Sequence, residues 1–371
     1  MEQGRPERFR RDRHLIGLCS SPHVGPVTIR RLLRAFGSAE AVFRARPAEL
    51  FGVDGVSEKR SEWIAGFSDW DALMKKIERV EADGARLVFH GDDEYPQALY
   101  ELGQDAPIML FVKGGIEPGD RFAVAIVGSR DCSEYGEAAT ARISARLAAA
   151  GITVVSGMAR GIDTAGHRGA IKAGGRTMAV LGCGIDVAYP PENRGLMGKI
   201  AGSGAVISEF PPGTPPLREN FPRRNRLISG LSLGVMVVEA APKSGSLITA
   251  KYALEQGKEV FAVPGSILSD TSAGTNDLIK QGARLVTGPD DVLEELAPVL
   301  KGFIKSSGVA PAPEMNDEEK GVCELLSGEP VHVDEIARRS GRQVSSILAT
   351  LLGLELKGVV RQMEGKRFHL N

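Results

Sequence analysis

Seven short apolar runs between residues 122 and 286 constrain the fold of this chain most strongly. They are rich in valine and isoleucine, and helical patterns such as Tyr135–Ala150 and Leu247–Gln256 separate them. Strands that are apolar on both faces belong to parallel sheets with helices on both sides. The pattern therefore predicts an α/β fold with a doubly wound, mostly parallel sheet. The predicted strands are Phe122–Val127, Ile152–Ser156, Thr177–Leu181, Ala205–Ser208, Val235–Glu239, Glu259–Val263 and Arg284–Val286.

Two of these strands end in small-residue turns that carry an arginine. The first turn is Gly128-Ser129-Arg130, and the second runs from Ser156-Gly157 to Arg160-Gly161. Glycine lets a ligand approach the backbone, and the helix that follows adds the positive end of its dipole. Arginine adds a planar fork that pairs with two phosphate oxygens. This edge of the sheet is therefore predicted to hold phosphate.

Later strand ends repeat the same chemistry. The segment after the fourth strand holds Arg224, Asn225 and Arg226, and the turn after Glu239 holds Ser244, Gly245 and Ser246, with Lys251 one helical turn later. A row of such sites suits a ligand with several phosphates in line, such as single-stranded nucleic acid. The other interpretation is that some of these arginines pair with carboxylates such as Glu209 and Glu239.

A conventional active site is harder to assemble from this sequence. Asp163 and His167 have the i, i+4 spacing of a metal pair, but no third ligand is evident, and a capping aspartate with an internally bonded histidine explains them better. Ser156, Asp163 and His167 have the residue types of a hydrolase triad, but the sequence has no Gly-x-Ser-x-Gly elbow. It also lacks a Walker A motif and the G-x-G-x-x-G fingerprint. The sequence therefore predicts neither catalysis nor a cofactor.

The totals limit the class of protein. With 371 residues and 42% hydrophobic content, the chain is long enough for several folded domains. The formal net charge is −1, so any nucleic-acid binding must come from a local basic patch. Four scattered cysteines, a charged N-terminus and the lack of a long apolar run predict a cytoplasmic protein without a membrane segment.

The two ends of the chain predict smaller helical domains. Residues 1–85 are predicted to form short helices. Val24–Leu33 and Phe51–Lys59 resemble helix-hairpin-helix elements, but the match is loose, and a small helical interaction module is the favoured interpretation. Residues 86–300 form the sheet domain, which includes strand-like Leu87–His90 and Ile108–Val112. Residues 301–314 have the composition of a linker.

Residues 315–371 predict a winged helix, with helices over Asp317–Leu326, Val333–Ser340 and Val344–Leu356 and a hairpin over Val359–Gln362 and Arg367–Leu370. The expected recognition helix has Arg342 as its one cation near the start, which favours protein contacts or packing over base reading.

The motifs of the central region resemble those of the DprA/Smf family, the DNA-processing proteins of bacterial natural transformation. They include IVGSR at 126–130, SGMARGIDTAGH at 156–167, FPRRNRLISGLS at 221–232 and VVEAAPKSGSLITA at 237–250. The resemblance implies an extended Rossmann-like domain that binds single-stranded DNA, forms homodimers and loads the RecA recombinase onto incoming DNA. It implies no catalysis. The DNA-binding residues that it implies are Gly128, Ser129, Arg130, Ser156, Gly157, Arg160, Gly161, Arg224, Asn225, Arg226, Ser244, Gly245, Ser246 and Lys251.

Two rival functions remain open from the residues alone. Related Rossmann-like phosphoribohydrolases process nucleotides with a Pro-Gly-Gly-x-Gly-Thr turn followed by a catalytic glutamate. In this sequence that turn is divided between Pro264-Gly265-Ser266 and Gly274-Thr275-Asn276. The second rival is an interaction scaffold in which the terminal domains carry the function.

Overall fold

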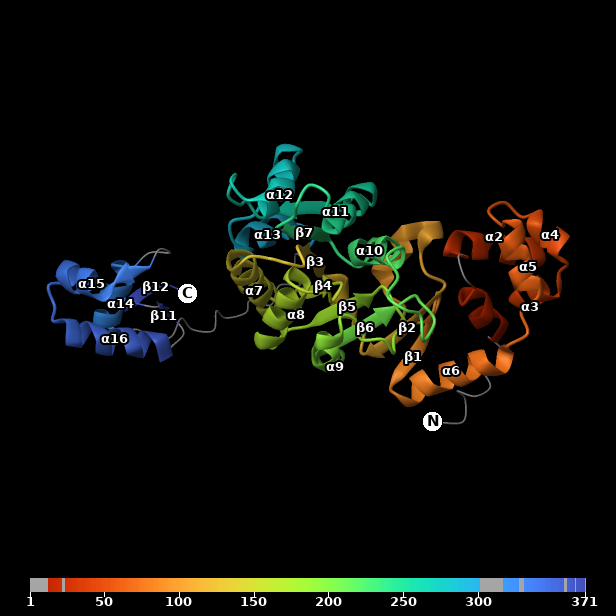
Figure 1. The fold of residues 1–371 in the computed structure, drawn as a ribbon, viewed down its shortest axis with the longest axis horizontal. Coiled ribbons are helices and arrows are strands. Elements are labelled where there is room, and N and C mark those ends of the chain that lie inside the picture. Colours follow the sequence, from red (N-terminus) through yellow and green to blue (C-terminus); the bar gives the residue numbers. More distant parts are fainter. Residues whose placement is uncertain are drawn as a thin grey trace. The chain divides into compact units, whose positions relative to one another are not determined.

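The structure is a computed structural model, and it describes residues 13–21, 24–300, 316–326, 330–356, 359–363 and 365–370. These residues form two compact units that divide near residue 305. The predicted linker, 301–314, and most of the charged N-terminus lie outside the described residues. The first unit contains the sheet and the N-terminal helices, and the second contains the C-terminal helices and hairpin (Figure 1).

The first unit is built on one nine-stranded sheet with the order β1-β2-β6-β5-β4-β3-β7-β8-β9. Every neighbouring pair from β6 to β9 is parallel, whereas β2 pairs antiparallel with both β1 and β6. The predicted doubly wound, mostly parallel sheet is therefore confirmed. The strands are β1 (Ala85–Phe89), β2 (Met109–Gly114), β3 (Ala123–Gly128), β4 (Thr153–Ser156), β5 (Thr177–Leu181), β6 (Gly204–Ser208), β7 (Gly234–Val238), β8 (Glu259–Ala262) and β9 (Arg284–Leu285).

Helices cover both faces of this sheet (Figure 1). Successive residues of β3 show the division, since Ala125 packs with the cluster under α10, α11 and α12, and Ile126 packs with the cluster under α7, α8 and α13. Both side chains are fully buried, which explains why the central strands are apolar throughout. The helices are α7 (Glu134–Ala149), α8 (Ile162–Lys172), α9 (Arg194–Ser203), α10 (Asn220–Gly230), α11 (Gly245–Glu255), α12 (Asp270–Lys280) and α13 (Pro289–Leu296), with short 3₁₀ helices at Gln97–Asp105, Pro118–Arg121 and Pro191–Asn193.

The strand order reverses between β3 and β7. From β3 the chain winds outward through β4, β5 and β6, then crosses back to β7 and continues outward through β8 and β9 on the other side. At such a switch point the loops after the two strands diverge to opposite faces and leave a crevice outside the carboxyl ends. The predicted phosphate-binding turns follow β3, β4 and β7, so the topology brings them to this crevice.

The N-terminal helices pack against the β1–β2 side of the sheet. Pro26 occupies the first turn of α2, as predicted, with Gly25 as its N-cap. Arg30 fastens α2 to the sheet domain by donating to the carbonyls of Gln104 and Ala106 at 2.9 and 2.7 Å. The helices are α2 (Pro26–Phe36), α3 (Ala39–Arg44), α4 (Pro47–Phe51), α5 (Glu58–Ala65) and α6 (Trp70–Ala82).

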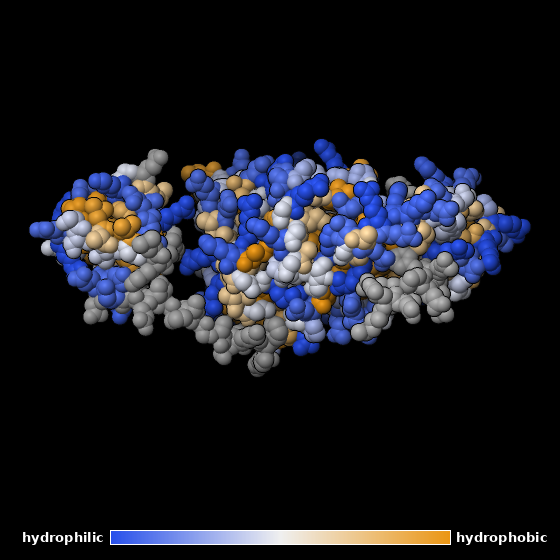
Figure 2. All heavy atoms as spheres, turned by 90° about the horizontal axis from the view of Figure 1, so that it is seen from below, coloured by the Kyte–Doolittle hydropathy of each residue, from blue (hydrophilic) through white to orange (hydrophobic). Residues whose placement is uncertain are grey.

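The second unit is a winged helix, as predicted. It contains α14 (Asp317–Glu324), α15 (Val333–Ser340), α16 (Val344–Leu356) and a three-stranded sheet of β10 (Val331–His332), β11 (Val360–Met363) and β12 (Arg367–Leu370). Ile347 and Leu351 on the inner face of α16 are fully buried in the small core. Two large apolar residues of α16 are exposed as well, Val344 at 38% and Leu352 at 59%, beside the exposed Ser345 and Ser346. Figure 2 shows hydrophobic residues gathered on this unit over α16.

In the part of the chain that the structure describes, no helix combines the length and the apolar character that crossing a membrane requires.

Candidate nucleic-acid interface

A cavity of about 410 Å³ opens at the switch point between β3 and β7. Its walls come from the turns after these two strands and from the first turns of α10 and α11, which are far apart in sequence, and Ala159 and Asp163 line it from the turn after β4 and the start of α8. Eight of the predicted site residues line it: Gly128, Ser129, Arg130, Arg224, Asn225, Ser244, Gly245 and Ser246. The structure therefore brings together residues from three of the four predicted segments.

Arg130 is an exposed cation of this cavity. Its guanidinium lies over the ring of Phe221 from α10, with 5.3 Å between Cζ and the ring centroid. Among the described residues it makes no ion pair with a carboxylate. Phe221 itself lines the cavity, and sequence reasoning did not select it. An arginine held over an aromatic ring at a cavity wall provides both a phosphate partner and a stacking surface.

Arg224 is the buried cation of the same cavity, with 4% of the residue exposed. One Nη atom donates to the carbonyl of Val180, whereas the buried Nε has no hydrogen-bond partner within the described chain. Burial lowers the pKa of Arg224 to about 10, although the nearby Asp163 carboxylate acts in the opposite direction. The group remains charged at neutral pH, and its Nε is a buried donor without a partner among the described residues.

Gly157 explains how this guanidinium fits. A methyl group at Gly157 would lie 2.1 Å from Nη1 of Arg224, so a larger residue would push the guanidinium out of its position. A glycine is thus needed at position 157 because the Arg224 guanidinium occupies the space beside it, and not because a ligand contacts Gly157.

The first turn of α11 supplies the fourth wall. Ser244 is the N-cap of this 11-residue helix, and its hydroxyl accepts from the amide of Ser246 at 3.3 Å. A methyl group at Gly245 would meet no heavy atom within 4 Å, so this backbone is open to the cavity. Lys243, which also lines the cavity, adds a cation beside the helix N-terminus. Anions are stabilised at such a position by the amides and the helix dipole.

The turn after β4 meets the turn after β3 and contributes Ala159 to the cavity lining, with Asp163 from the start of α8, but its predicted residues do not line the cavity. The amide of Ile162 donates to the carbonyl of Ser129 at 3.1 Å, and Gly161, at φ +67°, allows this close approach. Ser156 is fully buried and its hydroxyl donates to the carbonyl of Ile126 at 2.6 Å. These residues position the Ser129-Arg130 turn.

Three predicted cations lie elsewhere. Arg226 donates to both carboxylate oxygens of Glu209 at 2.6 Å, and both side chains are nearly buried. Arg160 pairs with Glu192 at the surface. Lys251 is 76% exposed and lies 3.7 Å from Glu255. The interpretation that an arginine pairs with Glu209 is therefore confirmed for Arg226.

Glu239 has a different role from the one considered. Its carboxylate accepts from the amide of Ser133 at 2.8 Å and from the Ser133 hydroxyl, which caps α7. No described arginine pairs with it. Glu239 therefore joins the end of β7 to the start of α7 beneath the cavity.

The residues considered for catalysis are hydrogen-bonded elsewhere. His167 is fully buried, its Nδ1 lies 2.7 Å from the Thr177 hydroxyl, and burial lowers its pKa to about 3. This confirms the internally bonded histidine. Asp163 was expected to cap α8, but the helix has no side-chain cap, and the carboxylate instead accepts from the amides of Gly157 and Ala159. Burial raises its pKa.

No group of three potential ligands that could hold a metal ion occurs among the described residues. The divided Pro-Gly turn closes through Asn276, whose side-chain amide exchanges two hydrogen bonds with the backbone of Gly265 at 3.2 and 3.0 Å.

The sheet, its switch-point cavity and the two accessory helical regions place the chain among multidomain Rossmann-like α/β proteins. Residues 86–297 match the family described as DNA recombination-mediator protein A, and the chain belongs to this DprA/Smf family. Residues 10–56 match the DprA-like N-terminal HHH domain, and residues 307–366 match the DprA winged helix domain.

Several relatives match this chain over most of their own length. Protein Smf of Escherichia coli is 42% identical over 346 residues, which cover 86% of this chain and 92% of that protein. The X-ray structure of DNA processing protein A from Streptococcus pneumoniae has a TM-score of 0.66 at 38% identity, and the match covers 76% of this chain and 97% of that one. The Helicobacter pylori protein, whose structure describes its single-stranded DNA binding mode, has a TM-score of 0.52 at 29% identity and covers 58% and 96%.

Proposed function

We propose that this protein binds single-stranded DNA along the carboxyl edge of its sheet, with the switch-point cavity as the principal contact. One observation carries the proposal: an exposed arginine, a buried arginine with an unused donor and an open helix N-terminus meet in one cavity. These three groups are all anion partners, and they converge from three segments of the chain.

The phosphates of the strand would contact Arg130, the Nε of Arg224 and the amides at the start of α11. A base would stack on Phe221, which Arg130 already covers from one side. Binding of this kind depends little on sequence, because phosphate contacts carry no base information. The similarity to the Helicobacter pylori protein, which binds single-stranded DNA, supports the same ligand for this chain.

The biological setting that we propose is DNA processing in natural transformation or recombination. The protein would protect incoming single strands in the cytoplasm and load the RecA recombinase onto them as a homodimer, without catalysis or a cofactor. Membership of the DprA/Smf family supports this setting. We propose the domain boundaries 1–85, 86–300 and 315–371 with a linker at 301–314.

The winged helix is proposed to contact protein rather than to read bases. Its exposed α16 face carries Val344 and Leu352, whereas a helix that reads the major groove needs hydrogen-bonding and cationic side chains.

The enzymatic alternative finds less support. Phosphoribohydrolases need a glutamate directly after their glycine turn, and here Asn276 closes that turn with both amide groups engaged. Release of free base from nucleoside monophosphates by the purified protein would favour this alternative.

The decisive test is the salt dependence of binding in an Arg130→Ala variant. Fluorescence anisotropy with labelled oligo-dT at several salt concentrations gives the affinity and its slope. We expect weaker binding and a slope reduced by roughly 0.7, the value for one lost phosphate contact on a single strand. Arg168→Ala removes an exposed arginine of α8 that does not line the cavity, and should leave both quantities unchanged. An unaltered slope in Arg130→Ala would remove this residue from the interface.

A further inference from the structure

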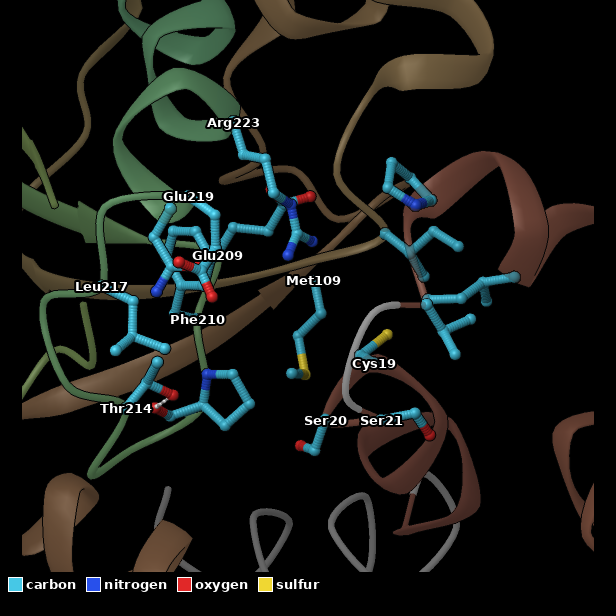
Figure 3. A pocket seen from close by; sticks show the side chains of 16 residues that line it. Cys19, Ser20, Ser21, Met109, Glu209, Phe210, Thr214, Leu217, Glu219 and Arg223 are labelled. Atoms are coloured by element: carbon cyan, nitrogen blue, oxygen red, sulfur yellow. Dashed lines mark hydrogen bonds between the residues drawn. The ribbon is translucent and has the colours of Figure 1, made fainter. Parts of the chain in front are cut away.

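A second cavity, of about 240 Å³, lies at the same edge of the sheet. Its residues Glu209 and Phe210 directly follow β6, and Met109 starts β2, which runs antiparallel to β6. The carboxyl end of β6 and the amino end of β2 therefore meet here. The N-terminal helical region closes the other side with residues that include Cys19 and Ser20 (Figure 3).

The floor of this cavity is apolar. Ile29, Met109 and Phe210 are each at most 5% exposed. Burial also raises the pKa of the Cys19 thiol well above its usual range, so this group stays neutral. Floors of this kind favour flat apolar surfaces, and a few polar groups around them set the orientation of a ligand.

Polar groups with unused hydrogen-bonding capacity surround the floor. Arg223 extends from α10 towards Met109 (Figure 3) and lies over the Phe210 ring, with 5.4 Å between Cζ and the centroid. No hydrogen bond or ion pair engages its guanidinium within the described chain. Across the cavity, the buried hydroxyl of Ser20 has no partner among the described residues. Buried groups of this kind are costly unless a ligand or water satisfies them.

The charges around the cavity balance. The carboxylate of Glu209 is paired with Arg226, and the remaining charged side chains of the lining, Arg223 and the exposed Glu219, are opposite in sign. The carboxylates of Glu209 and Glu219 would repel a phosphate here, and the guanidinium of Arg223 would repel an isolated cation. The fitting ligand is therefore neutral and flat, and it carries both donors and acceptors. A nucleobase has these properties.

This second cavity lies close to the switch-point cavity. The two cavities share the first turn of α10, since Phe221 lines one and Arg223 the other. Along the sheet, β6 is three strand spacings from β3, which is about 14 Å at roughly 4.8 Å per spacing. A strand held at the switch point can therefore reach this cavity within a few nucleotides.

We propose that this cavity is a nucleobase subsite for the same bound strand, an inference that rests on the proposed DNA binding. The site takes a base with an exocyclic amino group beside a ring acceptor, such as cytosine. The amino group donates to a carboxylate of Glu209 or Glu219, and Arg223 donates to the ring nitrogen or carbonyl. Thymine has no amino group and leaves the carboxylate without this partner.

The test compares oligo-dC with oligo-dT of equal length by fluorescence anisotropy. The wild-type protein is expected to bind oligo-dC about tenfold more tightly, the effect of one hydrogen bond to a charged group. Arg223→Gln and Glu219→Ala should each reduce this preference while oligo-dT binding stays close to wild type. The matched control Arg168→Gln should leave the preference intact. Thermal unfolding of each variant establishes that it is folded.

The outcomes separate the two proposals. Failure to bind either oligonucleotide overturns the proposed function. Equal binding of both, or a preference that survives Arg223→Gln and Glu219→Ala in folded protein, overturns the subsite alone. Free dCMP is the third probe: if it competes as well as oligo-dC does, the cavity binds a free nucleotide, and the assignment to the bound strand is wrong.

Discussion

Replacing Arg224 with methionine separates a ligand-binding arginine from a structural one. Burial lowers the pKa of Arg224 to about 10, well below its usual range, so holding this charge in the folded protein costs about 3 kcal/mol at roughly 1.4 kcal/mol per pKa unit. Methionine removes this cost, and it also removes the charged hydrogen bond to the Val180 carbonyl, which contributes about 1.5–3 kcal/mol. The two terms nearly cancel. We expect the free energy of unfolding of Arg224→Met to stay within about 2 kcal/mol of wild type.

Arg226→Met is the matched control, because it changes an arginine two residues further along the same helix. Arg226 is paired with Glu209, and the side chains are only 12% and 13% exposed. Removing one member of a buried pair leaves the other charge without compensation and costs about 3–5 kcal/mol. The two arginines are thus expected to differ in their effect on stability.

Urea unfolding followed by far-UV circular dichroism measures stability, and fluorescence anisotropy with oligo-dT measures binding. For Arg224→Met we expect nearly unchanged stability and at least about tenfold weaker binding, because one charge-assisted contact is lost. If the variant instead loses more than about 3 kcal/mol of stability and keeps its affinity for DNA, Arg224 only supports the fold, and the reasoning from its unused Nε is refuted.

Three further expectations concern stability. The Arg224 charge lowers the pKa of Asp163, so Arg224→Met should raise the pKa of this carboxyl further. A carboxyl whose pKa is higher in the folded state makes the protein less stable as pH rises. The variant should therefore gain stability relative to wild type when the pH falls from 7 to 5, as urea titrations at the two pH values would show. His167 has a folded-state pKa of about 3 against 6.5 unfolded, so its contribution falls as pH drops below 6.5, by about 2 kcal/mol at pH 5, and His167→Gln should flatten this decline. Gly128→Ala would place a methyl group 1.9 Å from the Val238 carbonyl oxygen and should cost about 3 kcal/mol in thermal unfolding, whereas an unchanged midpoint would contradict the packing described here.

The architecture was predictable because burial on both faces leaves a direct trace in the sequence. Thr177–Leu181 was predicted with the bounds it has in the structure, and Val344–Leu356 likewise, since each is an uninterrupted pattern between clear end signals. The two-residue strand β10 was not predicted, because it forms only by pairing with β12, a segment far along the chain. The capping role of Asp163 was wrong for a related reason: which amides a carboxylate reaches depends on the path of the preceding turn.

The arginines of α10 show why the binding site was less predictable than the fold. Arg223, Arg224 and Arg226 lie within four residues, and Arg224 and Arg226 were interpreted as one group, yet successive residues of a helix point about 100° apart. Arg223 reaches the cavity beside β6, Arg224 turns under Gly157, and Arg226 turns to Glu209. Sequence alone identifies a basic helix start, but the neighbours of each side chain come from strands that the sequence does not place.

The structure also gives most of the predicted glycines a different role from the one predicted. They were selected because glycine lets a ligand approach, but at Gly128, Gly157 and Gly161 the space beside the backbone is filled by the protein itself. At Gly245 it is open. Three of these glycines therefore let strands, turns and Arg224 close around the cavity, and only Gly245 presents bare backbone to a ligand. The same glycine-rich turns thus build the frame of the site, while the proposed DNA contacts lie at Arg130, Arg224 and the start of α11.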